Sequence, residues 1–295
     1  MSLFDLKIQL DRDSWGWGEH EIVNCSQEIS ALTEKLRVAV SSRYRIRRDF
    51  QLNKMHEYFT EDQIAQHMEE PGLWFDTVSE LGEAVVIEYH RFVQWLSAHL
   101  GLDLVFEADP PVRFHVPGLL DDKYRLENGE FFMYHSDTMV GDYFQEFNCW
   151  LPFCDAKASS TISLCSKQFS VATINSFASQ FGYSYDEYKQ GRGNFFEFMK
   201  DRPELIADLR EDAMPINLRR GQLLVFDSRN LHSTVENVEN TTRVSMDFRV
   251  MPVTAYRAIV RELSKLRKEP NAWDGKRFIM GEIFDSRTAG ELFGA

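Results

Sequence analysis

Cysteine is scarce in this sequence, and the few residues that occur are not spaced as metal-binding or redox pairs. Cys25, Cys149, Cys154 and Cys165 form no CxxC motif. A chain of 295 residues is also too long to depend on a small disulfide framework, which is typical of short secreted domains. We therefore expect the protein to work in a reducing compartment.

Long apolar runs are missing as well. No stretch approaches the roughly 20 apolar residues that a membrane-spanning helix needs. The N-terminus lacks a basic segment followed by an apolar one, which is the pattern of a secretory signal. The sequence therefore predicts a soluble, cytoplasmic protein with no membrane segment.

Basic residues are also fewer than acidic ones. The chain has 33 Lys and Arg against 46 Asp and Glu, a formal net charge of −13. Nucleic-acid-binding proteins concentrate Lys and Arg against the phosphates, so we expect no nucleic-acid partner. An acidic protein can still hold a locally basic pocket for an anionic small molecule.

Helical patterns dominate residues 1–110, which we interpret as a scaffold. Apolar residues recur at helical spacing over 29–40 and over 77–100, as expected for amphipathic helices. Between these segments, Thr60 and Gln63 form a capping-box pattern that predicts the start of a short helix. Hydrophobic residues make up 43% of the chain and include 23 Phe, which is enough for a sizeable core.

Residues 111–254 have the pattern of a β core. Short strands, separated by Gly, Pro, Asn and Asp, are predicted over 112–116, 130–135, 144–151, 161–164, 221–226 and 242–250. Because no helices alternate with these strands, the pattern predicts an antiparallel barrel or jelly roll. The expected fold class is therefore mainly β with flanking helices.

Two further segments complete a predicted single domain over 1–295. Residues 167–215 interrupt the strands, are rich in Phe and Tyr, and contain a predicted helix around 194–209. Such an insertion can close over a substrate as a lid, or pack its aromatic side chains on the exterior of the barrel. The pattern leaves both interpretations open. The tail, 255–295, is predicted to be helical.

A candidate metal-binding pair lies at the end of one predicted strand. His135 and Asp137 would share a face, because side chains alternate along a strand. An imidazole and a carboxylate are two-thirds of the two-His-one-carboxylate triad that binds non-haem Fe(II) and leaves coordination positions open. A similar pair, His67 and Glu69, lies in a helical pattern where the two side chains diverge, so we assign it no function.

A second histidine and an arginine follow on later strands. The segment 221–232 has the pattern of a turn, a buried strand and a second turn, and it ends at His232. In the next strand the polar residues that alternate with apolar ones are Arg243, Ser245, Asp247 and Arg249. This polar face either meets water or lines a ligand cavity, where a guanidinium can bind a carboxylate.

The ordered set of His135-x-Asp137, His232 and Arg243-x-Ser245 resembles the Fe(II)- and 2-oxoglutarate-dependent oxygenase superfamily. The resemblance is greatest to its phytanoyl-CoA-dioxygenase-like branch and to relatives in antibiotic biosynthesis, and it covers roughly 112–250. It implies a double-stranded β-helix, which is a cupin-like jelly roll; the helical N-terminal region and the C-terminal helix are predicted from the sequence pattern alone.

The resemblance also implies residue roles. His135, Asp137 and His232 would bind Fe(II), and Arg243 with Ser245 would bind the distal carboxylate of the co-substrate 2-oxoglutarate. The enzyme would then use O₂ and release succinate and CO₂.

Because related halogenases lack the carboxylate ligand, its presence at Asp137 favours hydroxylation over halogenation. Desaturation, ring closure and epimerisation stay open. The expected substrate is a small polar metabolite, such as an amino acid or a natural-product intermediate. The alternatives are an oxygenase that modifies a protein side chain, and a cupin-like metal isomerase or binding protein without oxygenase activity.

Several other residues are candidates for binding. Asn148 is a candidate contact to 2-oxoglutarate or substrate, and Trp150 shares its face, although the pattern does not decide which face points inward. Arg113 and Arg249 are candidate substrate ligands, with an ion pair as the alternative for each. His115 is a rival metal ligand, although a packed histidine is the more common case.

Overall fold

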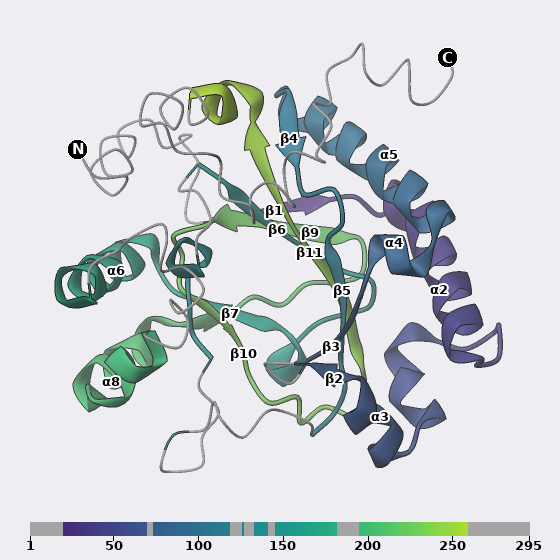
Figure 1. The fold of residues 1–295 in the computed structure, drawn as a ribbon, viewed down its shortest axis with the longest axis horizontal. Coiled ribbons are helices and arrows are strands. Elements are labelled where there is room, and N and C mark those ends of the chain that lie inside the picture. Colours follow the sequence, from purple (N-terminus) through teal and green to yellow (C-terminus); the bar gives the residue numbers. More distant parts are fainter. Residues whose placement is uncertain are drawn as a thin grey trace.

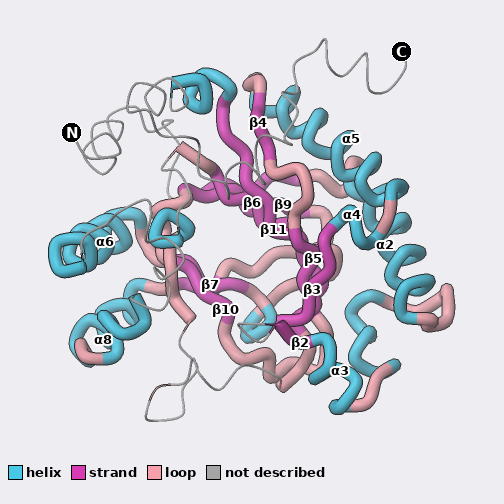
Figure 2. Tube along the Cα trace, viewed as in Figure 1, coloured by secondary structure: helices cyan, strands magenta, loops and turns pink. Residues whose placement is uncertain are grey.

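A computed structural model of the chain describes residues 20–69, 73–118, 126, 133–140, 145–181 and 195–258. In these residues, strands occupy the middle of the molecule and helices lie on two sides of them (Figure 1, Figure 2). The strands are β1 His20–Asn24, β2 Met68–Glu69, β3 Leu73–Thr77, β4 Leu104–Phe106, β5 Pro111–His115, β6 Phe147–Pro152, β7 Ile162–Leu164, β8 Met214–Pro215, β9 Gln222–Asp227, β10 His232–Thr234 and β11 Arg243–Pro252. The helices are α2 Ile29–Tyr44, α3 Glu61–His67, α4 Val78–Leu81, α5 Glu83–Leu100, α6 Lys167–Phe181 and α8 Pro203–Asp212, with 3-10 turns η2 Leu52–Tyr58, η4 Asp137–Val140 and η5 Ala158–Ser160.

The described strands form one large and one small sheet. The large sheet has the order β1-β9-β6-β11-β5-β3-β2, with β4 also pairing with β11. The small sheet has the order β10-β7-β8. Every strand pair in both sheets is antiparallel. The prediction of a mainly β core with flanking helices is therefore confirmed at the level of antiparallel sheets surrounded by helices.

The two faces of the large sheet have opposite character, and β11 shows why. Val244, Met246 and Phe248 are fully buried in the core that the sheet forms with α2 and α5. Because alternate residues point to opposite faces, Arg243 and Asp247 point to the other side of the sheet, where they line a cavity. The large sheet therefore has an outer apolar face under the helices and an inner polar face.

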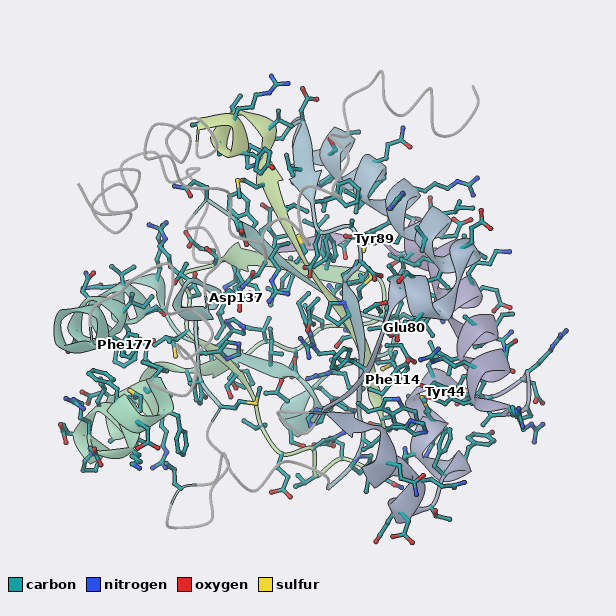
Figure 3. The ribbon with its side chains drawn as sticks, viewed as in Figure 1. Tyr44, Glu80, Tyr89, Phe114, Asp137 and Phe177 are labelled. Carbon is teal, nitrogen blue, oxygen red and sulfur yellow. The ribbon has the colours of Figure 1, made fainter. Side chains whose placement is uncertain are left out.

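The N-terminal helices cover the outer face. Tyr89 of α5 packs on Phe248 of β11, with ring centres 5.5 Å apart, and Phe114 of β5 packs on Tyr44 of α2, with ring centres 6.3 Å apart. Tyr89 and Phe114 lie on the helix side of the strands, and Asp137 lies on the other side (Figure 3). The segment predicted as one helix over 77–100 is two helices, because Gly82 interrupts it with φ 107° and ψ 163°. Such a backbone conformation is open to glycine and strained for other residues.

The prediction that residues 1–110 are helical is wrong in part. This region also contributes β1, β2, β3 and β4 to the large sheet. These strands are too short for their alternation to stand out from the surrounding helical patterns, and pairing with later strands stabilises them. The capping box of α3 is confirmed: Thr60 N donates to Gln63 Oε1 over 2.9 Å, and Gln63 N donates to Thr60 Oγ1 over 3.3 Å.

The described part of the 167–215 segment forms a separate helical cluster. Phe177, Phe195 and Phe198 are buried against one another between α6 and the helical residues that precede α8. The helix predicted over 194–209 is broken before Pro203, as expected because proline disfavours helical backbone in the preceding residue. The aromatic and glycine residues of 182–194 lie outside the described residues, as does the tail from 259 onward.

Among the residues that the structure describes, no helix has both the length and the apolar character needed to cross a bilayer.

Candidate metal centre

A short loop, rather than a regular strand, carries the first two candidate ligands. Residues 133–134 have no regular structure, His135 forms an isolated bridge with His232, and Asp137 begins η4. The predicted strand over 130–135 is therefore not observed in its described part, and residues 130–132 lie outside the described residues. Asp137 reaches the site through the turn, in which Thr138 N donates to Ser228 O over 3.4 Å.

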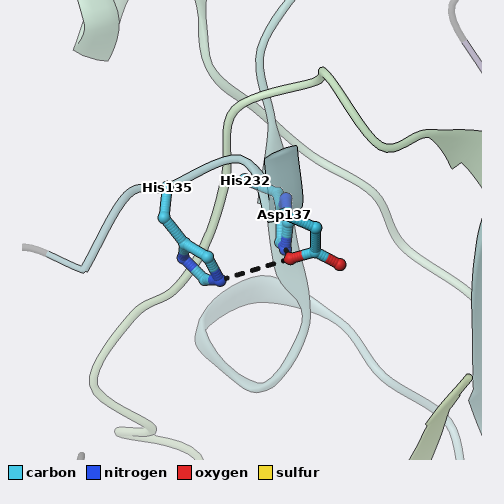
Figure 4. A group of neighbouring side chains, drawn as sticks. All are labelled: His135, Asp137 and His232. Atoms are coloured by element: carbon cyan, nitrogen blue, oxygen red, sulfur yellow. Dashed lines mark ion pairs between the residues drawn. The ribbon is translucent and has the colours of Figure 1, made fainter. Parts of the chain in front are cut away.

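The loop and β10 bring three ligand atoms together. Oδ1 of Asp137 lies 3.6 Å from Nε2 of His135 and 3.6 Å from Nε2 of His232. One ligand atom from each residue lies within 4.8 Å of the others, and the three side chains point toward a common centre (Figure 4). Two imidazoles and one carboxylate are the donor set of the non-haem Fe(II) triad.

Hydrogen bonds fix which nitrogen of each ring is available. His135 Nδ1 lies 3.0 Å from Met133 O, and His232 Nδ1 lies 3.0 Å from Asn230 O. A carbonyl oxygen only accepts hydrogen bonds, so each Nδ1 carries the proton and each Nε2 is unprotonated. Both rings are therefore in the tautomer that a metal bound through Nε2 requires.

Burial also favours the neutral form of the second histidine. Removal from water lowers the pKa of His232, and the nearby Asp137 carboxylate opposes this effect only in part. His232 is therefore neutral at neutral pH, as a metal-binding imidazole must be.

A cavity of about 640 Å³, including its open mouth, adjoins the three ligands. The large sheet lines it with its inner face, through residues that include Arg113, Asn148, Trp150, Phe226, Arg243 and Asp247. The small sheet contributes Ile162, His232 and Thr234. The polar face of β11 therefore lines a cavity and does not face bulk water.

Arg243 is a buried cation in this cavity. Its side chain is 1% exposed, and its guanidinium carbon lies 5.5 Å from the centre of the Trp150 ring. Among the described residues, it has no carboxylate partner, and its one hydrogen bond is from Nη1 to Ser160 O over 3.4 Å. Burial lowers the pKa of Arg243 to about 10, so the group stays charged at neutral pH.

Several buried polar atoms of β11 and β6 have no hydrogen-bond partner among the described residues. They are Arg243 Nε and Ser245 Oγ on β11, and both amide atoms of Asn148 on β6. Leaving a buried donor or acceptor unpaired costs about 1–3 kcal/mol, so these atoms indicate a site that a polar ligand completes.

The structure decides which face of β6 points inward. Asn148 lies opposite Arg249 and opposite Phe226 in the strand pairing, and Trp150 lies opposite Asp247. Both Asn148 and Trp150 line the cavity. The sequence left open which face of β6 points inward, and the pairing of β6 with β11 determines it.

The other two arginines of the cavity face acids. Arg113 forms an ion pair with Asp247. The sequence predicted that Asp247 lies on the polar face of β11 but did not identify its partner. Arg249 donates to Oδ2 of Asp137 from Nε over 2.9 Å and from Nη2 over 2.5 Å, and Nη1 lies 3.6 Å from Glu107 Oε2. The sequence did not predict the Arg249 contact with a metal ligand, because it depends on how the η4 turn meets β11.

The remaining histidines lie apart from the triad. Among the described residues, the metal-ligating group consists of His135, Asp137 and His232, and His115 is not part of it. His115 is buried opposite Arg243 on β5, and its ring nitrogens have no hydrogen-bond partner among the described residues. His67 stacks on Trp74, with ring centres 4.7 Å apart.

The sequence matches no protein-family model and no curated protein. Similar solved structures include the epimerase SnoN in complex with Fe³⁺, alpha ketoglutarate and nogalamycin RO, with 15% identity, 85% of this chain and 84% of that chain covered, and a TM-score of 0.47. EctD from S. alaskensis with bound Fe has 12% identity, coverage of 86% and 78%, and a TM-score of 0.46. EvdO2 from Micromonospora carbonacea var. aurantiaca has 16% identity, coverage of 82% and 89%, and a TM-score of 0.46.

Proposed function

We propose that the protein is an Fe(II)- and 2-oxoglutarate-dependent dioxygenase that hydroxylates, or otherwise oxidises, a small polar metabolite. One observation carries the proposal: a His-Asp-His group, with ligand atoms within 4.8 Å of one another, adjoins a cavity that holds a buried arginine with no acid partner among the described residues. A metal and a diacid co-substrate together account for both features.

The donor set fits the metal. His135 Nε2, His232 Nε2 and Asp137 Oδ1 would hold Fe(II), with both rings already in the required tautomer. Fe(II), when bound with 2-oxoglutarate and O₂, supplies the oxidising chemistry and yields succinate and CO₂. The share of the protein is to hold the ligands, orient the co-substrate and exclude water from the cavity.

The unpaired polar atoms fit the co-substrate. Arg243 would bind the distal carboxylate of 2-oxoglutarate, because a buried guanidinium is a strong, directional partner for a carboxylate. Ser245 Oγ would donate a second hydrogen bond to this group, and the Asn148 amide would contact 2-oxoglutarate or substrate. Binding would thereby satisfy polar atoms that are otherwise buried without partners.

The rest of the cavity would bind the substrate. Arg113 with Asp247 offers charge of both signs, and Trp150, Ile162 and Phe226 offer apolar surface. This mixture suits a small polar molecule such as an amino acid or a natural-product intermediate. The facing sheets would be the two halves of a double-stranded β-helix over 111–254 in a single domain, with 167–215 as a candidate lid.

Anaerobic addition of Fe(II) and 2-oxoglutarate tests the proposal. A weak visible charge-transfer band is expected in the wild-type protein, followed in air by slow succinate formation even without substrate. His232→Ala should lose the band, because it removes a metal ligand. Metal binding without any effect of 2-oxoglutarate would contradict the proposal and would instead identify a cupin-like metal protein without oxygenase activity.

A further inference from the structure

The two oxygens of the Asp137 carboxylate have different surroundings. Oδ1 faces Nε2 of both histidines at 3.6 Å. Oδ2 points the other way and accepts two hydrogen bonds from one guanidinium, from Arg249 Nε over 2.9 Å and Arg249 Nη2 over 2.5 Å. The carboxylate is therefore shared between the metal position and an arginine.

Arg249 is itself held in place from its other side. Its backbone O accepts from Glu107 N over 2.9 Å, and its Nη1 lies 3.6 Å from Glu107 Oε2. Glu107 is held in turn by Tyr89, whose hydroxyl donates a hydrogen bond to the backbone O of Glu107 over 2.6 Å. The side chains of Arg249 and Glu107 are only 14% and 9% exposed, so water screens the ion pairs weakly.

We infer that Arg249 is a positioning residue that restricts Asp137 to binding a metal through Oδ1 alone. A metal-binding carboxylate can coordinate through one oxygen or through both. With Oδ2 held by two charge-assisted hydrogen bonds, the second oxygen is not available to the metal. Arg249 thereby keeps a coordination position open for the co-substrate. The inference rests on the proposed function, because it requires a metal bound at His135, Asp137 and His232.

This role differs from that of an ordinary structural ion pair. A structural pair stabilises the fold, and its loss changes stability without changing the metal environment. Removal of Arg249 would instead free Oδ2 to turn toward the metal and occupy the position that 2-oxoglutarate needs. Hydrogen bonds from outside the ligand set are known to orient ligands in this way.

Co(II) is a suitable probe, because its visible spectrum reports the number and arrangement of its ligands. We expect the Co(II) form of Arg249→Gln to differ from wild type in band intensity before any co-substrate is added. We also expect the affinity of this form for 2-oxoglutarate to fall, because Asp137 Oδ2 would compete for the same coordination position; a fall of roughly 10- to 100-fold would match the loss of metal affinity or activity that follows the loss of an outer hydrogen bond to a ligand. Arg249→Lys keeps the charge but not the paired N–H donors. Its Co(II) band intensity and its affinity for 2-oxoglutarate should therefore lie between those of wild type and Arg249→Gln.

Arg113→Gln is the matched control. It removes a guanidinium from the same inner face of the large sheet, where Arg113 pairs with Asp247 and not with a metal ligand. Its Co(II) spectrum should match that of wild type. If Arg249→Gln does not fold, Arg249→Lys carries the test through the same two readouts.

The outcomes separate the inference from the proposed function. A wild-type protein that binds neither Co(II) nor 2-oxoglutarate would overturn both. A wild-type protein that binds both, beside an Arg249→Gln variant with the same Co(II) spectrum and the same 2-oxoglutarate affinity, would overturn only the role of Arg249.

Discussion

His135 and His232 are joined to each other through their backbones. His135 N donates to His232 O over 3.1 Å, and His232 N donates to His135 O over 2.8 Å. This two-way bridge sets the ring centres 4.5 Å apart. Because backbone groups make the bridge, the pairing of these two segments places the two imidazoles side by side.

The bridge predicts that a ligand can be removed without disturbing the site around it. His232→Ala keeps both backbone hydrogen bonds, so the far-ultraviolet circular dichroism should match that of wild type. Co(II) binding should be lost, because only two ligands are left. Retained Co(II) affinity in the variant, measured by titration, would contradict the assignment of His232 as a ligand.

Arg243 is predicted to control the affinity for 2-oxoglutarate. Arg243→Ala should weaken its binding by about 1.5–3 kcal/mol, or roughly 10- to 150-fold, the usual value of hydrogen bonds to a charged group. Isothermal titration with the Co(II) protein measures this change. Arg91→Ala is a suitable control, because Arg91 is 56% exposed on α5 and pairs with Glu88. Equal affinities in wild type and Arg243→Ala would exclude the role.

His115 is predicted to make stability depend on pH. Burial, reinforced by the neighbouring Arg243 charge, lowers its pKa well below the usual value of 6.5. Between the folded and the unfolded pKa, the unfolded chain binds a proton that the folded protein does not. The stability contribution is therefore complete above about pH 6.5 and is lost as the pH falls through the folded pKa.

Urea unfolding at several pH values below about 6.5 measures this effect. One such proton contributes a slope of at most about 1.4 kcal/mol per pH unit. His115→Leu should reduce the slope by up to this amount, and it leaves the metal ligands intact. An identical pH dependence in wild type and variant would show that His115 does not carry it.

Gly221 is predicted to be required at the start of β9. Its φ is +91°, and an added Cβ would lie 2.9 Å from Ser26 Cα. Gly221→Ala therefore combines backbone strain with a steric clash, and it should lower the free energy of unfolding by about 2–5 kcal/mol. Gly101→Ala is the control, since Gly101 has φ +66° with nothing near an added Cβ. The free energy of unfolding of this control should fall by only about 1–2 kcal/mol. Similar decreases in both variants would argue against the clash at Gly221.

Much of the local structure could be predicted because it depends on short-range periodicity. The alternation of Arg243, Ser245 and Asp247 with apolar neighbours corresponds to the two faces of β11, and the capping box at Thr60 forms as its pattern indicates. The long helix over 77–100 could not be predicted correctly, because Gly82 interrupts it only through its unusual backbone conformation.

The sequence by itself determined which chemical groups are available: two imidazoles, a carboxylate, and an arginine on the polar side of a strand. The tertiary structure alone decided what each group faces. That Asp137 presents Oδ1 to the histidines and Oδ2 to Arg249, and that Asn148 points inward, follow from strand pairing and a turn between distant segments. Periodicity reports the face on which a side chain lies, whereas contacts between distant segments determine its partner.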